Sequence, residues 1–222
     1  MKSLFMTLAL VLALGVGMAF AVPTGFTCIT NNSATNCATG QTQLQYDLFD
    51  LGTQVRFDFT NLGPLSSTIT QVYFDDNRPV LGAFSSFTYT GNVSFHVGAS
   101  PGNLPGGTSV LPAFSADDAF GRDNPVIKGV DPGETLGLTF DYGNALSFQD
   151  VVDDLSTGAL RLGLHVQRFV NSGSESFVNI PPDSGGGGGG EPPTDPVPEP
   201  GTFMLLGSGL LGLVVVKKRY SK

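Results

Sequence analysis

The sequence contains no tryptophan, and it has only two cysteines and two histidines among its 222 residues. Thiol and imidazole side chains, which commonly bind transition metals or act as thiol nucleophiles and general bases, are therefore scarce. The chain lacks the GxSxG and HExxH motifs, and its six consecutive glycines at 185–190 lack the lysine that a phosphate-binding loop requires. We therefore expect a protein that is not an enzyme and has no catalytic residues.

Positive charge is also sparse in the body of the chain. All 19 acidic residues lie between Asp47 and Glu199, and only six basic residues lie there, so this part has a formal charge of −13 (6 minus 19). Such a surface repels nucleic acid and anionic lipid. Nucleic acid is therefore excluded as a partner.

The N-terminal end has the pattern of a secretory signal. Lys2 precedes an apolar stretch from Leu4 to Gly17, and Ala19-Phe20-Ala21 follows. A basic start, a short apolar run and a small-x-small site are typical of a signal peptide, here residues 1–21, which signal peptidase removes. The remaining ectodomain, residues 22–180, is long enough for one well-buried core.

The C-terminal end, residues 198–222, has three parts in a fixed order. A tripeptide comes first and is made of Pro198, Glu199 and Pro200. An apolar run at 203–216 follows, and as a helix it would span about 21 Å against roughly 30 Å of hydrocarbon in a bilayer. The basic stop after it comprises Lys217, Lys218 and Arg219. A linker rich in glycine and proline, residues 181–197, separates this end from the ectodomain.

This tail resembles the PEP-CTERM sorting signal of Gram-negative bacteria, which exosortase, a membrane-embedded transpeptidase-like enzyme, recognises. The resemblance implies secretion across the inner membrane, transient retention there, and removal of the tail near the Pro-Glu-Pro tripeptide. It further implies delivery to the cell surface or the exopolysaccharide matrix, as in a biofilm. The alternative is a permanent C-terminal transmembrane anchor. Segments 99–107, 131–143 and 160–179 also resemble domains found on such proteins, which imply no activity.

Apolar residues alternate with polar ones throughout the ectodomain. The alternating sets are Leu44/Tyr46/Leu48, Val55/Phe57/Phe59, Val72/Phe74, Val93/Phe95/Val97, Leu136/Leu138/Phe140/Tyr142 and Leu160/Leu162/Leu164/Val166. A period of two indicates antiparallel strands with one buried face. We therefore predict an all-β fold, a single antiparallel β-sandwich of jelly-roll type, in which Asp131-Pro132-Gly133 turns a hairpin between 126–130 and 135–142.

One short amphipathic helix interrupts this pattern. Ser147 is a favourable N-cap, Asp150 stands at the capping-box position, and Gly158 follows the last helical residue. The apolar face comprises Phe148, Val151, Val152 and Leu155, and the outer face Asp150, Asp153 and Asp154. We expect this helix to cover one end of the sandwich.

Cys28 and Cys37 are the two cysteines, and they lie close together after the signal peptide. A secreted chain favours a disulfide, and a metal or redox pair is the alternative, although no CxxC spacing supports it. We predict a disulfide that closes a loop rich in threonine and asparagine. His96 and His165 are the two histidines. Each occupies a strand position that alternates with the apolar residues, so both side chains are expected to face solvent.

Five aspartates are candidate ligands for a calcium ion. Acidic residues follow strands or occupy polar loops at Asp75, Asp76, Asp117, Asp118 and Asp123. Ca²⁺ prefers six to eight hard oxygen ligands of this kind, but the spacing matches no EF-hand, and solvated turn residues are the alternative. The sequence thus predicts no required cofactor, with calcium as an option.

We expect a secreted protein, processed by exosortase, with a structural or adhesive role at the cell surface or in the matrix. A carbohydrate-binding module, in calcium-dependent or independent form, is the first alternative. It would bind at the loop from Gly98 to about Asn124 and at the exposed faces of the sheets. A secreted hydrolase that uses Asp75, Asp76, Asp117 and Asp118 is the second.

Overall fold

The computed structural model describes residues 25–179. The expected signal peptide (1–21), the linker (181–197) and the apolar helix (203–216) lie outside these residues. The described part consists of ten strands, two α-helices and two short 3₁₀-helices.

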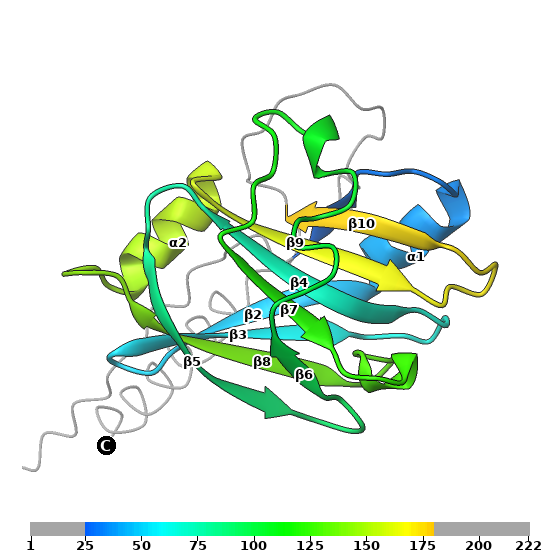
Figure 1. The fold of residues 1–222 in the computed structure, drawn as a ribbon, viewed down its shortest axis with the longest axis horizontal. Helices are drawn as coiled ribbons and strands as arrows, with labels where there is room; N and C mark the ends of the chain where they lie inside the picture. Colours follow the sequence, from blue (N-terminus) through cyan, green and yellow to red (C-terminus); the bar gives the residue numbers. More distant parts are fainter. Residues whose placement is uncertain (1–24, 180–222) are drawn as a thin grey trace, which may run out of the picture. The chain divides into compact units, whose positions relative to one another are not determined.

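The strands form two antiparallel sheets (Figure 1). The six-stranded sheet has the order β1 (Phe26–Cys28), β10 (Ser174–Asn179), β9 (Leu160–Gln167), β4 (Thr68–Asp76), β7 (Asp118–Arg122) and β6 (Phe95–Val97). The four-stranded sheet has the order β2 (Leu44–Asp50), β3 (Gln54–Asn61), β8 (Thr135–Tyr142) and β5 (Leu81–Tyr89). The prediction of a mostly β chain in antiparallel sheets is confirmed.

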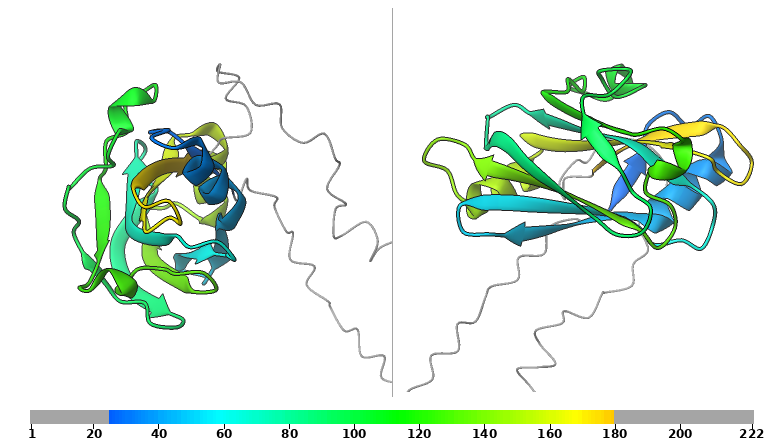
Figure 2. Two further views of the ribbon diagram at one scale, coloured as in Figure 1. Left: turned by 90° about the vertical axis from the view of Figure 1, so that its right-hand side faces the viewer. Right: turned by 60° about the horizontal axis from the view of Figure 1, so that its bottom comes forward.

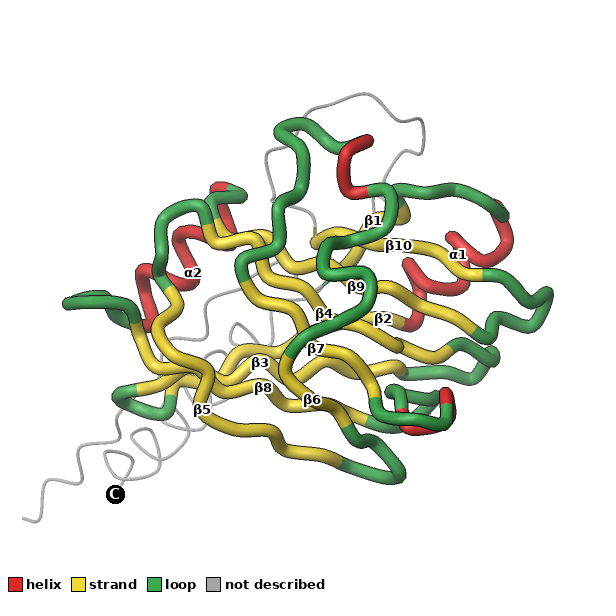
Figure 3. The backbone as a smooth tube through the Cα atoms, viewed as in Figure 1, coloured by secondary structure: helices red, strands yellow, loops and turns green. Residues whose placement is uncertain are grey.

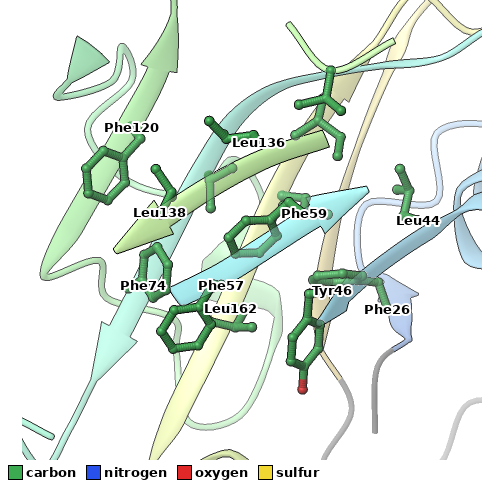
Figure 4. Packing of buried hydrophobic residues seen from close by; sticks show 14 of the residues in the cluster. Phe26, Leu44, Tyr46, Phe57, Phe59, Phe74, Phe120, Leu136, Leu138 and Leu162 are labelled. Carbon is green, nitrogen blue, oxygen red and sulfur yellow. The ribbon is translucent and has the colours of Figure 1, made fainter. Parts of the chain in front are cut away.

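The two sheets pack against each other through phenylalanines (Figure 4). Phe74 of β4 lies 5.1 Å from Phe57 of β3 and 4.8 Å from Phe140 of β8, measured between ring centroids. Phe120 of β7 lies 5.8 Å from Phe140 in an edge-to-face arrangement. Aromatic pairs with this geometry stabilise a core beyond the area that they bury. The alternating apolar residues of the sequence therefore form the interface between the sheets.

One loop covers the outer face of the six-stranded sheet. Residues 98–117, which include the 3₁₀-helix η1 (Gly107–Ser109), run across that face (Figure 2). A second, small core forms beneath the loop from Tyr73, Leu104, Phe114 and Val178. A Cβ on Gly163 of β9 would lie 2.9 Å from Leu104 and 3.0 Å from Phe114, so a glycine is needed for this approach. Both faces of β9 are consequently buried.

Three details of the strand prediction are wrong. Val97 ends β6 with 63% of its surface exposed, although it shares the parity of the buried Phe95. His165 is buried, whereas His96 is exposed as expected.

The third detail is the predicted hairpin. The Asp131–Glu134 turn forms, but the residues before it are the 3₁₀-helix η2 (Val126–Lys128) and not a strand. Val130 instead pairs with Ile69 of β4, because its apolar side chain is buried in the core there.

The predicted helix is present as α2 (Phe148–Thr157), with a complete Ser147–Asp150 capping box and Gly158 at its C-cap. Asp154, however, is buried rather than on the outer face, because its carboxylate accepts a hydrogen bond from Arg78 Nε at 2.8 Å. A second helix, α1 (Ala34–Gln43), occupies the segment predicted to be a loop (Figure 3).

The predicted disulfide joins Cys28 of β1 to Cys37 of α1. Helix α1 begins at the N-cap Ser33, where Glu175 of β10 accepts hydrogen bonds from the backbone amides of Asn32 and Ser33 at 3.0 and 2.7 Å. A carboxylate is favourable at this end of a helix. The disulfide and Glu175 therefore fasten α1 to the edge of the six-stranded sheet.

Replacing both cysteines with serine should lower the free energy of unfolding by about 2.7 kcal/mol, because the bridge closes a short loop in the unfolded chain. Urea denaturation of the wild type and the double variant measures the difference. Thr42→Ser, a change of similar size at an exposed position of α1, serves as the control. Equal midpoints for the wild type and the double variant would contradict the stabilising role.

Candidate polar groove on the six-stranded sheet

A polar groove crosses the outer face of the six-stranded sheet beside the covering loop. Its volume is about 220 Å³. The groove is lined by Thr70, Gln71, His96, Ser100, Gly121, Arg122, Asn124 and Gln167. These residues come from four adjacent strands, β9, β4, β7 and β6, and from the loops that follow β6 and β7.

The register of the strands determines which residues lie side by side in the floor of the groove. Gln71 of β4 stands opposite His165 of β9 on one side and Gly121 of β7 on the other, and Gly121 stands opposite His96 of β6. Directly opposed residues of antiparallel strands point to the same face. A Cβ on Gly121 would lie 3.0 Å from the carbonyl oxygen of Gly98 and 3.5 Å from His96 Nε2, so a glycine is needed where the chain after β6 packs against β7.

Two buried polar atoms at the groove have no hydrogen-bond partner in the described structure. Gln71 donates from Nε2 to the carbonyl oxygen of Ser100 at 2.5 Å, but its Oε1 accepts nothing. Arg122 donates from Nη1 to the backbone oxygen of Asp123 and to Asn124 Oδ1, each at 3.0 Å, but its Nε donates to nothing. Unsatisfied buried groups are uncommon in folded proteins, and each needs an explanation.

A hydrogen-bonded histidine–aspartate pair stands at the rim of the groove. His96 Nδ1 lies 2.8 Å from Asp123 Oδ1, and Ser94 Oγ donates to Asp123 Oδ2 at 2.5 Å. The hydrogen bond from Ser94 and then that from His96 hold the pKa of Asp123 below its usual value. This carboxylate is therefore ionised and directed towards partners within the chain.

A wider hollow adjoins the groove and shares Arg122 and Gln167 with it. Its volume is about 630 Å³, and the turn after β9 forms its wall. Arg168 in this wall pairs with Asp131 at 3.2 Å.

His165 lies beneath the same face. Its Nδ1 lies 3.2 Å from Ser176 Oγ, and its Nε2 lies 3.3 Å from Gln167 Nε2. Burial lowers the pKa of this imidazole, an effect that the charge of Glu175 opposes. The ring is thus a neutral, hydrogen-bonded part of the sheet rather than the solvent-facing residue that its parity predicts.

Two of the acidic residues predicted to bind calcium are used inside the fold. Asp75 is buried in an ion pair with Arg161 and also accepts from the amide of Ser115 at 2.9 Å. The carboxylate of Asp76 accepts from the amides of Val80 and Leu81 at 3.0 and 2.8 Å. Burial raises the pKa of Asp76 despite these two bonds.

The other acidic residues are divided between two places. Asp117 lies near Asp76 and accepts from its amide at 2.8 Å, and burial, followed by the charges of Asp117 and Asp76, raises the pKa of Asp118. Asp123 stands apart, at the rim of the groove. The fold thus brings Asp75, Asp76, Asp117 and Asp118 to one end of β4 and does not bring Asp123 to them.

Within residues 25–179, one group of three side chains has metal-ligand atoms all within 4.8 Å of one another: Cys28, Cys37 and Glu175. Both sulfur atoms are in the disulfide. The calcium site stays a prediction.

Sequence reasoning indicated part of the groove, because Ser100, Gly121, Arg122 and Asn124 lie within the segment 98–124 that was predicted to be a binding loop. The alternation of polar and apolar residues in β4 and β6 indicates that Gln71 and His96 face outward. This alternation does not show which strands are neighbours in the sheet. Arg122 ends a strand that the sequence places in a loop. The missing information is the register that aligns β4, β7 and β6.

The sorting motif at Pro198, Glu199 and Pro200 and the basic stop at Lys217, Lys218 and Arg219 lie outside the described residues. Within residues 25–179, neither helix is long and apolar enough to cross a membrane.

Comparisons with known proteins matched one family model. The model of the PEP-CTERM protein-sorting motif matches residues 196–219. Searches of the curated proteins and of the solved structures gave no match. The match coincides with the tripeptide, the apolar run and the basic stop, and motifs of this type direct export to the cell surface or extracellular space with processing by exosortase. The chain carries a PEP-CTERM protein-sorting motif at residues 196–219.

Proposed function

We propose that the chain is a non-enzymatic protein of the cell surface or extracellular matrix, with a structural or adhesive role in a biofilm. The sorting motif at 196–219 is the observation that carries this proposal. The disulfide between Cys28 and Cys37 supports an oxidising location outside the cytoplasm. The described residues contain 15 acidic and six basic side chains, a formal charge of −9 that favours solubility outside the cell.

We also propose the route of maturation. Signal peptidase removes residues 1–21 as the chain crosses the inner membrane of a Gram-negative cell. The apolar run at 203–216 then holds the chain in that membrane, with its basic end in the cytoplasm. Exosortase acts near Pro198–Pro200 and releases residues 22 to about 200 from the membrane intermediate. The short apolar run supports a transient rather than a permanent anchor.

Removing residues 196–222 should abolish surface display and the cell aggregation that depends on it. A deletion strain complemented with either the full or the shortened chain allows aggregation and surface labelling to be compared. We expect the shortened chain to fold and to reach the periplasm or medium without surface labelling. Equal surface labelling and aggregation with the two chains would contradict the proposal.

A carbohydrate-binding role is the second candidate, and the polar groove favours it. Sugar hydroxyls need hydrogen-bond donors and acceptors, and the lining supplies them from amide and hydroxyl side chains: Thr70, Gln71, Ser100, Asn124 and Gln167. A calcium-dependent form would use Asp117 and Asp118. The hydrolase alternative has less support, because Asp75 and Asp76 already accept hydrogen bonds within the fold.

We further infer a jelly-roll-like sandwich. Consecutive strands β3, β4 and β5 alternate between the two sheets, as do β7, β8 and β9. Such alternation wraps the chain around a single core, which supports this architecture. The consecutive pairs β2–β3, β6–β7 and β9–β10 each remain within one sheet and extend the arrangement beyond eight strands.

A further inference from the structure

Three aliphatic side chains are exposed on two loops at one end of the sandwich. Leu62 and Leu65 lie between β3 and β4 and are 54% and 49% exposed, and Val170 lies between β9 and β10 and is 68% exposed. Both loops lie at the right-hand end of the domain in Figure 1. Aliphatic side chains that gather on the surface of a secreted domain indicate a place of contact with another apolar surface.

Hydrogen bonds join the two loops and fix the shape of the first. Ser66 Oγ donates to the carbonyl oxygen of Arg168 at 2.9 Å, which connects the β3–β4 loop to the β9–β10 turn. The buried Gln43 accepts hydrogen bonds from the backbone amides of Leu62 and Leu65, each at 2.8 Å. The three exposed side chains therefore belong to one connected surface, the aliphatic patch.

Charge is balanced beside the aliphatic patch and strongly negative at the other end of the domain. Arg168 pairs with Asp131 at 3.2 Å next to the patch. Helix α2 lies at the far end of β4 and carries Asp150, Asp153 and Asp154. The phosphate groups of phospholipids repel such a cluster of carboxylates. Of the two ends, the one with the patch is therefore the end that a phospholipid surface accepts.

The chain length between the domain and the apolar run is sufficient for this contact. Strand β10 leads away from the patch to Asn179, a distance of about 20 Å for six residues. The 23 residues at 180–202 separate it from the run at 203–216. A flexible chain of that length has a root-mean-square span of about 26 Å. The patch can thus reach the same membrane that holds the run.

We propose that Leu62, Leu65 and Val170 insert into the surface of the membrane that holds the C-terminal run, a contact that rests on the maturation route proposed above. Lipid is favoured over a protein partner, because a bilayer accepts side chains from separate loops without a complementary shape. The maturation route also keeps the domain next to lipid. The domain thus has two contacts with the membrane until the tail is removed.

The contact depends on the tail. One acyl chain alone gives only marginal binding to a membrane, and three partly inserted side chains bury less apolar surface. The linker raises the effective concentration of the patch at the membrane. Cleavage near Pro198–Pro200 therefore weakens the contact with lipid and releases the domain.

The absence of tryptophan from the chain permits a direct test. Leu65→Trp places one fluorophore in the patch, and Leu111→Trp places one in the covering loop, where the leucine is 95% exposed. Each chain, purified with its tail from an exosortase-deficient strain, is reconstituted into phosphatidylcholine vesicles with and without brominated acyl chains. Leu65→Trp should lose most of its emission to the brominated lipid, because inserted side chains lie about 5–10 Å deep, and Leu111→Trp should not.

A second pair of variants tests the other patch residues. Adding Leu62→Ser and Val170→Ser to Leu65→Trp should lower the inserted fraction at least about threefold, because apolar surface is removed. Leu51→Ser and Val97→Ser form the matched control, with the same residue types 47% and 63% exposed outside the patch. This control should leave the quenching of Leu65→Trp unchanged. Circular dichroism checks folding, and Val170→Trp replaces Leu65→Trp as the reporter if the latter unfolds.

Equal quenching of Leu65→Trp and Leu111→Trp, or equal effects of the two serine pairs, would overturn the lipid contact. A blue-shifted Leu65→Trp emission that bromine does not quench and that dilution of the protein abolishes would overturn it in favour of pairing between two copies. Absence of quenching in a chain that cells process and display leaves the proposed function intact. Quenching in a chain that cells do not display supports the lipid contact and contradicts the proposed function.

Discussion

Replacing Arg161 with leucine should lower the free energy of unfolding by about 3–5 kcal/mol, because it leaves the buried carboxylate of Asp75 without a counter-ion. The arginine also donates to the backbone oxygens of Pro112 and Ala113, at 2.6 and 2.9 Å, and lies 5.3 Å from the Phe114 ring centroid. One side chain therefore neutralises a buried charge in β4 and fastens the covering loop to β9. Chemical denaturation at neutral pH measures the loss.

Arg56→Leu is the matched control for this change. Arg56 pairs with Asp58 at 2.8 Å on the outer face of the four-stranded sheet, and its side chain is 27% exposed. Ion pairs with access to water contribute about 0–1 kcal/mol. The double change Arg161→Leu and Asp75→Asn should recover part of the loss, because it also removes the buried charge. Equal losses for Arg161→Leu and Arg56→Leu would show that the buried pair has no special role.

Strands with strict alternation were the part of the fold that the sequence predicted well. In β3, every second residue is buried, because one face of the strand packs against the core and the other face is partly exposed to solvent. The same reasoning fails for β9, where both faces are buried by the core on one side and the covering loop on the other. The alternation of residues within a strand does not show whether a distant segment of the chain covers its outer face. His165 was therefore predicted to be exposed, although the covering loop helps to bury that face.

Helix α1 could not be predicted from its own residues. Its sequence ATNCATGQTQ is rich in threonine, asparagine and glycine, which are weak helix formers. Its supports come from distant positions: the disulfide to β1 and the carboxylate of Glu175 at its N-terminus. Helix α2 was predictable because its cap, its apolar face and its terminating glycine are all local.

The pairing of the strands that form the candidate groove was unpredictable for a related reason. Gln71, Gly121 and His96 are separated by 25 to 50 positions in the chain, and only strand register brings them into one row. Asp75, by contrast, looked like a metal ligand, whereas the fold gives it an internal cation, Arg161. A lone sequence shows which side chains are polar, but their partners depend on tertiary pairing.

Processing of the C-terminal tail is the second prediction with a large effect, because it is all or none. The sorting motif at 196–219 is the target of exosortase, and the tripeptide in it precedes an apolar run of 14 residues. That run would span about 21 Å as a helix, shorter than the roughly 30 Å of bilayer hydrocarbon, so it suits a temporary hold on the membrane. A permanent anchor would instead keep the run and its basic end.

The intact mass of the chain, isolated from wild-type cells and from an exosortase-deficient strain, tests the sorting account most directly. The wild-type protein should lack residues 1–21 and everything beyond about Pro200, and the deficient strain should retain the tail through Lys222. The same full-length tail in both strains would contradict the account and identify residues 203–216 as a permanent anchor.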